Sequence, residues 1–277
     1  MTEDESAALG LDGENLSSEI DPTRPSIARV YDFVLGGKQH FAIDREVSKA
    51  MFTVLPQARQ LAESGRITLL RMVRWLVREA GITRIVDLGS GLPTEGNVHE
   101  IAHAIDPDVR VVYVDNDPMV LAHSRALLDH SDNVAVIESD IRDVEATFAH
   151  PELRALIDLD EPFAIVAANV LHHLEDADAY RTAAALRARL SPGSYFASCN
   201  FLDDDEQRAR DMERAMIEGG LGTGRFRTWS ELQQFFEGLE MVEPGLTYAH
   251  DWRPDEDTPQ DSAVHTLHSA GIGRRPS

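Results

Sequence analysis

A short apolar segment that runs into a glycine-rich turn constrains this chain more than any other feature of its sequence. Residues 84–96 read RIVDLGSGLPTEG, with Asp87 near the end of the apolar part. Gly89 and Gly91 follow directly, and a glycine lets the backbone approach a ligand where a side chain would collide with it. The segment therefore predicts a buried strand, a ligand-binding turn and the start of a helix, in that order.

This turn differs from the common phosphate-binding loops. A dinucleotide-binding loop has a third glycine where this chain has Thr94, and the Gly-Lys-Ser/Thr ending of a P-loop is missing. An acidic strand end followed by Gly-x-Gly, with Ser90 between the glycines, suits a ligand that carries an amine and a ribose rather than a chain of phosphates. S-adenosylmethionine is such a ligand.

Three further apolar segments, 109–115, 134–138 and 163–168, predict strands that end in polar residues. Asp115 closes the first of them about 20 residues beyond the turn, where a carboxylate can accept hydrogen bonds from ribose hydroxyls. Past the second, an acid and an apolar residue can hold the amino group and the ring of an adenine. Because the carboxyl ends of such strands meet at one crevice, we expect one cofactor site there. The expected contact residues at these strand ends are Asp115, Asn116, Asp140, Ile141 and Asn169.

Five motifs follow one another along the chain in a recognisable order. They are DLGSG, YVDNDP, ESDIRD, ANVLHHL and SPGSYFASCNF, and together they resemble the class I S-adenosylmethionine-dependent methyltransferases. The upstream run ARVYDFVLGGKQHFAID, with GLPTEGNVHE and YVDNDPMVLAHSRALL, is more narrowly similar to an actinobacterial S-adenosyl methyltransferase family once catalogued as a domain of unknown function. The resemblance extends from about Pro25 to the C-terminus.

The resemblance implies an α/β fold built on a doubly wound Rossmann-like sheet. Seven strands are expected, mostly parallel, with an antiparallel strand near the C-terminus and a helical lid at the N-terminus. It also implies S-adenosyl-L-methionine as the cofactor and direct transfer of its methyl group to an oxygen, nitrogen or carbon atom. The resemblance does not identify the acceptor.

The segments upstream of the first strand are expected to cover the cofactor. Ser26 can cap a short helix that ends at a Gly-Gly pair, and a longer helix is expected from 57 to 80. The Gly-Gly pair can be a helix C-cap, or its N–H groups can meet the carboxylate of the cofactor. The family resemblance favours the second interpretation, which makes Tyr31 and Gly37 candidate cofactor contacts.

Composition and pattern divide the chain into three parts. Residues 1–21 contain acidic residues and neither lysine nor arginine, so they are expected to form a disordered tail. Residues 22–81 are the predicted helical lid, and residues 82–277 are the predicted cofactor-binding domain. Within this domain the later elements are expected at 177–190, 203–218 and 229–236 for helices and at 194–201, 241–248 and 263–272 for strands.

One motif points to a different chemistry. His99-Glu100-Ile101-Ala102-His103 matches His-Glu-x-x-His, which places two zinc ligands one helical turn apart with a glutamate base between them. However, the helix that holds this motif begins at the glycine turn, and its apolar residues are expected to pack on the sheet. A zinc metallohydrolase is therefore the alternative to the methyltransferase, and no metal site is expected in the latter.

The pair His172-His173 follows the fourth predicted strand and supplies the candidate catalytic residues. Either imidazole can accept a proton from the acceptor as the methyl group moves, because histidine titrates near neutral pH. Alignment of acceptor and cofactor alone can also accelerate such a transfer greatly. A protein that binds the cofactor without catalysis would look the same in sequence, so this third interpretation stays open.

Charge and composition limit the partners. The chain has 277 residues, with 48 acidic against 26 basic residues and a formal charge of −22, so nucleic acid is disfavoured as an acceptor. A small-molecule acceptor is expected instead, and the oligomeric state is left open. The single cysteine, Cys199, suits a reducing compartment, and neither a signal peptide nor a membrane span is visible. These features favour a cytoplasmic location.

Overall fold

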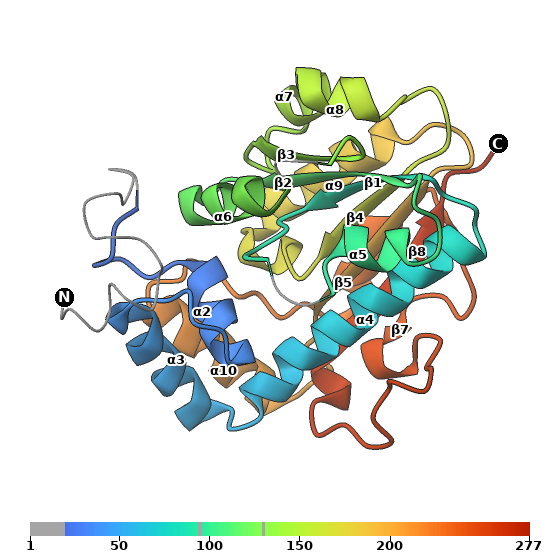
Figure 1. The fold of residues 1–277 in the computed structure, drawn as a ribbon. Coiled ribbons are helices and arrows are strands. Elements are labelled where there is room, and N and C mark those ends of the chain that lie inside the picture. The colour runs from blue at the N-terminus through green and yellow to red at the C-terminus, as the bar shows by residue number, and fades with distance from the viewer. Residues whose placement is uncertain (1–19, 94–95, 129–130) are drawn as a thin grey trace.

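The computed structural model describes residues 20–93, 96–128 and 131–277 (Figure 1). Nearly all of the predicted acidic tail, and the position of Thr94, lie outside these residues. Within them the chain forms a mixed sheet of eight strands. The strands are β1 Arg84–Leu88, β2 Arg110–Asp115, β3 Val134–Glu138, β4 Ala164–Ala168, β5 Tyr195–Phe201, β6 Glu240–Met241, β7 Thr247–Tyr248 and β8 His268–Arg274.

The strand order reverses in the middle of the sheet. It runs β3-β2-β1-β4-β5-β8-β6, and β7 also pairs with β8. β1 to β5 are parallel to one another, whereas β8 is antiparallel to its three partners. The predicted doubly wound, mostly parallel sheet with an antiparallel strand near the C-terminus is therefore confirmed. Between β1 and β4 the order changes direction, which is where open α/β sheets bind ligands.

The C-terminal strands differ from the sequence prediction. The single strand expected over 241–248 is divided into β6 and β7, because Pro244 has no N–H for a sheet ladder and Gly245 turns the chain at a φ of +92°. The strand expected from residue 263 begins only at His268, after a 3-10 turn over His265–Leu267. The described residues consequently contain eight strands rather than seven.

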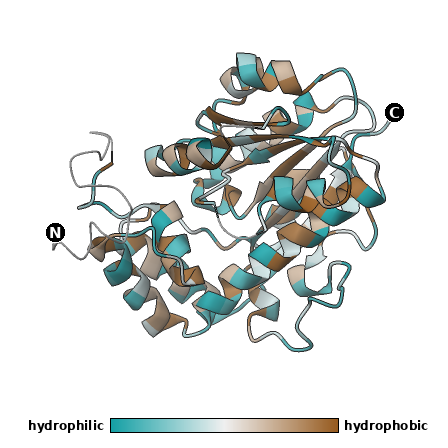
Figure 2. Cartoon of the chain, viewed as in Figure 1, coloured by the Kyte–Doolittle hydropathy of each residue, from teal (hydrophilic) through white to brown (hydrophobic). Residues whose placement is uncertain are grey.

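Helices cover both faces of the sheet. Ile85 and its neighbours on one face pack under α4, α5 and α6, whereas Val86 and its neighbours on the other face pack under α7, α8, α9 and α11. Because both faces are buried, the central strands are almost continuously apolar, as Figure 2 shows. These helices are α4 Ala58–Arg78, α5 Val98–His103, α6 Pro118–Leu128, α7 Val144–Ala149, α8 Pro151–Leu156, α9 Asp176–Arg189 and α11 Trp229–Gln233.

A second helical layer lies beside the sheet (Figure 1). It contains α2 Ile27–Leu35, α3 Ala42–Val54, α10 Gln207–Glu218 and the first turns of α4, which share one apolar cluster. The remaining part of α4 packs on the sheet. One continuous helix therefore fixes this layer against the sheet. No helix of the described residues is long and apolar enough to cross a membrane.

Polar contacts fasten the N-terminal helices. Ser26 caps α2, as predicted, and its hydroxyl also donates to Asp117 at the start of α6. Asp44 of α3 is fully buried and accepts from Nε of Arg29 in α2 at 2.8 Å and from the N–H of Phe41 at 2.8 Å. A buried carboxylate of this kind must be paired to be tolerated. The two helices are thus held as a unit.

Candidate functional site

A cavity of about 750 Å³ lies between the second helical layer and the carboxyl ends of the parallel strands. Its walls come from the ends of β1, β2 and β4, from the loop after β3, and from α2, α4 and α10. The cavity thus lies at the point where the strand order reverses. Twelve of the predicted site residues line it: Tyr31, Asp87, Gly89, Ser90, Gly91, Asp115, Asn116, Asp140, Ile141, Asn169, His172 and His173.

The glycine turn after β1 has the geometry that its residues require. Gly89 and Gly91 have φ values of +66° and +67°. A Cβ atom on Gly89 would lie only 2.4 Å from Cγ2 of Val170, so a larger residue does not fit there. The N–H of Gly91 donates to Oδ2 of Asp115 at 2.9 Å, which ties the turn to the end of β2.

Asp115 is held at the end of β2 by backbone donors. Its Oδ1 accepts from the N–H groups of Asn116 at 2.8 Å and Asp117 at 2.9 Å, in addition to the bond from Gly91 to Oδ2. Burial raises the pKa of this carboxyl above its ordinary value, although the three N–H donors oppose the shift. The donors fix the direction in which the carboxylate faces the cavity.

Asp87 is a buried acid at the end of β1. Burial raises its pKa to about 7, and the positive charge of Arg66 opposes the shift. Arg66 belongs to α4, lines the cavity, and donates from Nη2 to the carbonyl of Gly96 at 2.8 Å. No sequence motif marks Arg66, because its helix precedes the motif region and shows no pattern that points to a ligand.

The loop after β3 brings a charged pair to the cavity. Asp140 accepts from Nε of Arg142 at 3.0 Å, and this bond lowers the pKa of the carboxyl. Ile141 follows and is buried. The acid and the apolar residue expected at this strand end thus both line the cavity, with the arginine as an added neighbour.

Asn169 has a strained backbone and a fixed side chain. Its φ is +55°, and its N–H donates to the carbonyl of Cys199 at 2.9 Å. Its Oδ1 accepts from Nε2 of His268 at 2.9 Å, and Nδ1 of His268 accepts from the hydroxyl of Ser64 at 3.2 Å. A Cβ atom on Gly65 would lie 2.1 Å from Nδ2 of Asn169, so the amide rests directly against α4. Asn169 could be predicted from its place after the fourth strand, whereas no sequence pattern marks the partners that hold it.

The two candidate catalytic histidines differ in exposure. His172 is 1% exposed, and its ring stacks on Phe201 at 3.7 Å between ring centres. His173 is partly exposed, and its Nδ1–H donates to the carbonyl of Thr223 at 3.1 Å. Burial lowers the pKa of His172 well below its usual range and that of His173 to about 4. Both imidazoles are therefore uncharged at neutral pH, and both bind a proton weakly.

The two N-terminal candidates, Tyr31 and Gly37, differ in whether they line the cavity. Tyr31 lines the cavity, and its hydroxyl donates to the carbonyl of Ala62 at 3.0 Å. Gly37 does not line the cavity: its N–H donates to the carbonyl of Asp32 at 2.8 Å. A Cβ atom on Gly37 would lie 2.0 Å from Oδ1 of the same aspartate. The expectation that Gly37 presents a free N–H to the cofactor is wrong, because the Gly-Gly pair is a helix C-cap.

Comparison with known proteins decides the family. The sequence matches the S-adenosyl methyltransferase family over residues 13–276, which is nearly the whole chain. The chain belongs to this family. Its cofactor is S-adenosyl-L-methionine, and the protein is a methyltransferase.

Solved structures agree with this assignment. The methyltransferase is 43% identical to a candidate methyltransferase from Thermobifida fusca YX, with a TM-score of 0.88 over 92% of this chain and 96% of that one. A DUF574 family protein from Streptomyces avermitilis MA-4680 is 35% identical, with a TM-score of 0.88 over 92% and 99%. The CurJ carbon methyltransferase shares the fold alone, at 11% identity and a TM-score of 0.54 over 90% of this chain and 67% of that one. No curated protein matches the chain.

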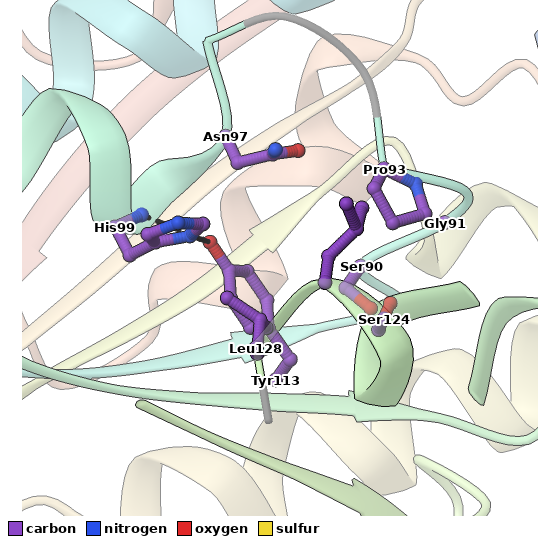
Figure 3. A pocket seen from close by; sticks show the side chains of 9 residues that line it. Ser90, Gly91, Pro93, Asn97, His99, Tyr113, Ser124 and Leu128 are labelled. Atoms are coloured by element: carbon purple, nitrogen blue, oxygen red, sulfur yellow. Dashed lines mark hydrogen bonds between the residues drawn. The ribbon is translucent and has the colours of Figure 1, made fainter. Parts of the chain in front are cut away.

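The His-Glu-x-x-His motif of the methyltransferase has a structural explanation. Nδ1 of His99 lies 2.7 Å from the hydroxyl of Tyr113 (Figure 3). Nε2 of His103 donates to the carbonyl of Val109 at 2.8 Å. Among the described residues no group of three or more histidine, cysteine or acidic side chains is arranged to hold a metal ion. Each histidine fastens α5 to β2 or to the turn before it. In the part of the chain that the structure describes, no arrangement favours the zinc alternative.

Proposed function

We propose that the methyltransferase transfers the methyl group of S-adenosylmethionine to a small molecule held inside the cavity. The observation that carries this proposal is the single space that joins the strand ends to the helical layer. At about 750 Å³ it falls in the range of about 300–1,000 Å³ that is typical of small-molecule sites. Because α2, α4 and α10 form one wall, the space favours an acceptor that enters whole.

The residues at the strand ends fit the cofactor by their chemistry. We assign Asp115 to the ribose hydroxyls and Asp87 to the amino group, because carboxylates accept hydrogen bonds from both. Arg66 suits the carboxylate of the cofactor, since a guanidinium pairs well with it. The glycine turn, whose positive φ values suit glycine, gives the backbone close access to a ligand. Asp140 and Ile141 would hold the adenine.

Alignment of the acceptor is the main contribution that we assign to the chain. When bound, S-adenosylmethionine supplies an electrophilic methyl group and leaves as S-adenosylhomocysteine, whose sulfur keeps the electron pair of the broken bond. A hydroxyl or N–H acceptor would give an electron pair to the methyl carbon and release its proton to solvent as the product leaves. His172 and His173 bind protons too weakly to be good general bases near neutral pH. The walls would instead hold the acceptor atom close to the methyl group and exclude water, which can account for a large acceleration.

Methyl transfer into a fractionated extract tests the proposal. The protein is incubated with tritiated S-adenosylmethionine and with either the dialysable or the non-dialysable fraction of a cell extract. We expect enzyme-dependent label in the dialysable fraction, and its loss with the Asp115→Ala variant. Label confined to protein or nucleic acid would contradict a small-molecule acceptor.

A further inference from the structure

Among the described residues, the charged side chains that line the cavity are confined to two places. One group lies at the strand ends and the adjoining part of α4, and consists of Arg66, Asp87, Asp115, Asp140 and Arg142. The other lies where the segment before α2 meets the start of α6, and consists of Arg24 and Asp117. The first group is the part of the cavity assigned to the cofactor.

The wall formed by the second helical layer and the end of β5 is apolar. The helices α2, α3, α4 and α10 contribute to it. Three of its residues are methionines, whose flexible side chains adapt to ligands of irregular shape. The residues of this wall include Val34, Met51, Leu61, Phe201, Met212 and Met216.

Two uncharged imidazoles adjoin this apolar wall. The ring of His172 lies flat against Phe201, with an angle of 12° between the ring planes. The Nδ1–H of His173 is committed to the carbonyl of Thr223. A neutral imidazole carries one proton, so Nε2 of His173 is left as a hydrogen-bond acceptor. Because His173 lines the cavity, this nitrogen can serve as a polar anchor beside the apolar wall.

A charged acceptor would be poorly tolerated against such a wall. An ion loses its hydration when it is buried, and the loss must be offset by an opposite charge or by several hydrogen bonds. Among the described lining residues, the apolar wall offers no opposite charge. An uncharged molecule loses much less on entry and gains from the burial of its apolar surface.

We propose that the methyl acceptor is an uncharged, largely apolar molecule whose hydroxyl or neutral N–H group donates a hydrogen bond to Nε2 of His173. This inference rests on the proposed function, since it describes the acceptor of the same reaction. It explains why an apolar wall and a fixed imidazole occur side by side, because both would bind the same acceptor. The wall selects against charge, and the histidine directs the polar end of the acceptor.

Matched probes of different charge test the acceptor class. Benzyl alcohol, benzoate and benzylammonium form one set, and octanol, octanoate and octylammonium form another. Binding of each probe to the protein saturated with S-adenosylhomocysteine is measured by saturation-transfer NMR and titration. We expect the alcohol of each set to bind at least about tenfold more tightly than either ion. Equal or tighter binding of an ion, or binding of no probe, would overturn the proposal.

Two substitutions at one position test the role of the histidine. The side chain of His173→Asn can still donate to the carbonyl of Thr223 but has no atom at the position of Nε2. His173→Gln does the reverse, since its amide reaches the position of Nε2. We expect the alcohols to bind about fivefold to tenfold more weakly to His173→Asn and nearly normally to His173→Gln. The opposite ranking, or equal losses, would contradict the assigned hydrogen bond.

The affinity for S-adenosylhomocysteine separates the two proposals. It is measured first for each protein and should be the same in the wild type and in both variants. If the wild type does not bind S-adenosylhomocysteine, the proposed function fails and the acceptor class fails with it. If the wild type binds S-adenosylhomocysteine and an ionic probe binds as tightly as the matching alcohol or more tightly, only the proposed acceptor class is wrong.

Discussion

The charge of Asp87 lowers the stability of the free protein. Burial raises the pKa of this carboxyl to about 7, compared with 3.8 in an exposed state. Between these two pH values the folded protein binds more protons than the unfolded chain, so the free energy of unfolding falls as pH rises from about 4 to about 7. Above pH 7 this contribution is constant. The protein keeps this acid although its charge lowers the free energy of unfolding, as expected for a residue that binds a cationic group of a ligand.

Asp87→Asn should therefore stabilise the free protein more at high pH than at low pH. We expect the gain in the free energy of unfolding to be about 2 kcal/mol larger at pH 8 than at pH 5, because asparagine has no charge to bury. Urea denaturation at the two pH values measures this difference. Asp160→Asn, at an exposed position, is the control and should show no such difference. A gain in the free energy of unfolding that is independent of pH would show that burial of the ionised carboxylate does not lower stability.

Gly65 permits the position of Asn169. In an ordinary helix, Gly→Ala stabilises by about 1 kcal/mol. Here the added Cβ would meet Nδ2 of Asn169 at 2.1 Å, so Gly65→Ala should displace the amide and weaken binding of S-adenosylhomocysteine by about tenfold. In an Asn169→Gly background, where glycine suits the φ of +55°, Gly65→Ala should have no further effect on affinity. Additive losses measured by titration calorimetry would contradict a direct contact.

A site residue could be predicted from the sequence where its motif and its contacts lie close together in the chain. The glycine turn and Asp115 lie within one strand-helix-strand unit, β1-α5-β2, and the order of residues alone brings them to the cavity. Arg66 reaches the cavity from a distant segment, and His268 holds Asn169 from another, so no local pattern marks either residue. Gly37 was predicted as a cofactor contact although it does not line the cavity. The sequence of a Gly-Gly pair is the same whether it caps a helix or faces a ligand.

Among the elements, α2 and α3 depend on one buried ion pair. Asp44 is 0% exposed and Arg29 is 4% exposed, and the carboxylate also accepts from the N–H of Ser26 at 3.0 Å. Asp44→Asn should lower the free energy of unfolding by about 3 kcal/mol, because it leaves a buried guanidinium without its counter-charge. Glu46→Gln, on the exposed side of the same helix, is the matched control. Chemical denaturation that gives equal values for the two variants would refute this role of the pair.

Elements with clear end signals were predicted well from the sequence. α2 has a serine N-cap and a glycine C-cap, and the five parallel strands form compact apolar runs. α3 was not predicted, because its N-cap is Phe41, whose side chain cannot accept a hydrogen bond. The division of the strand at Pro244 and Gly245 was also missed, since the flanking residues suit a continuous strand.

At the scale of the whole molecule, the cavity lies between two packed parts of the structure, or bodies, which the helix α4 joins. The sheet with its covering helices is one body, and the second helical layer has an apolar cluster of its own. α4 takes part in both, which keeps the layer close to the strand ends. A ligand between them contacts both bodies and should hold them together.

Binding of the cofactor product should therefore slow hydrogen exchange in both walls of the cavity. With S-adenosylhomocysteine we expect slower exchange in α2, in α10 and in the turn at 89–91, since bound protein opens less often. α7 and α8 lie away from these walls (Figure 1) and serve as an internal reference. Slowing confined to the turn would show that the helical layer does not close on the cofactor.

The most direct test of the account is calorimetric titration of chelator-treated protein with S-adenosylhomocysteine and S-adenosylmethionine. We predict one-to-one binding in the micromolar range that chelation does not alter, and at least tenfold weaker binding to Asp115→Ala. An absence of binding by the folded wild-type protein, or an affinity that appears only after zinc is added, would contradict it.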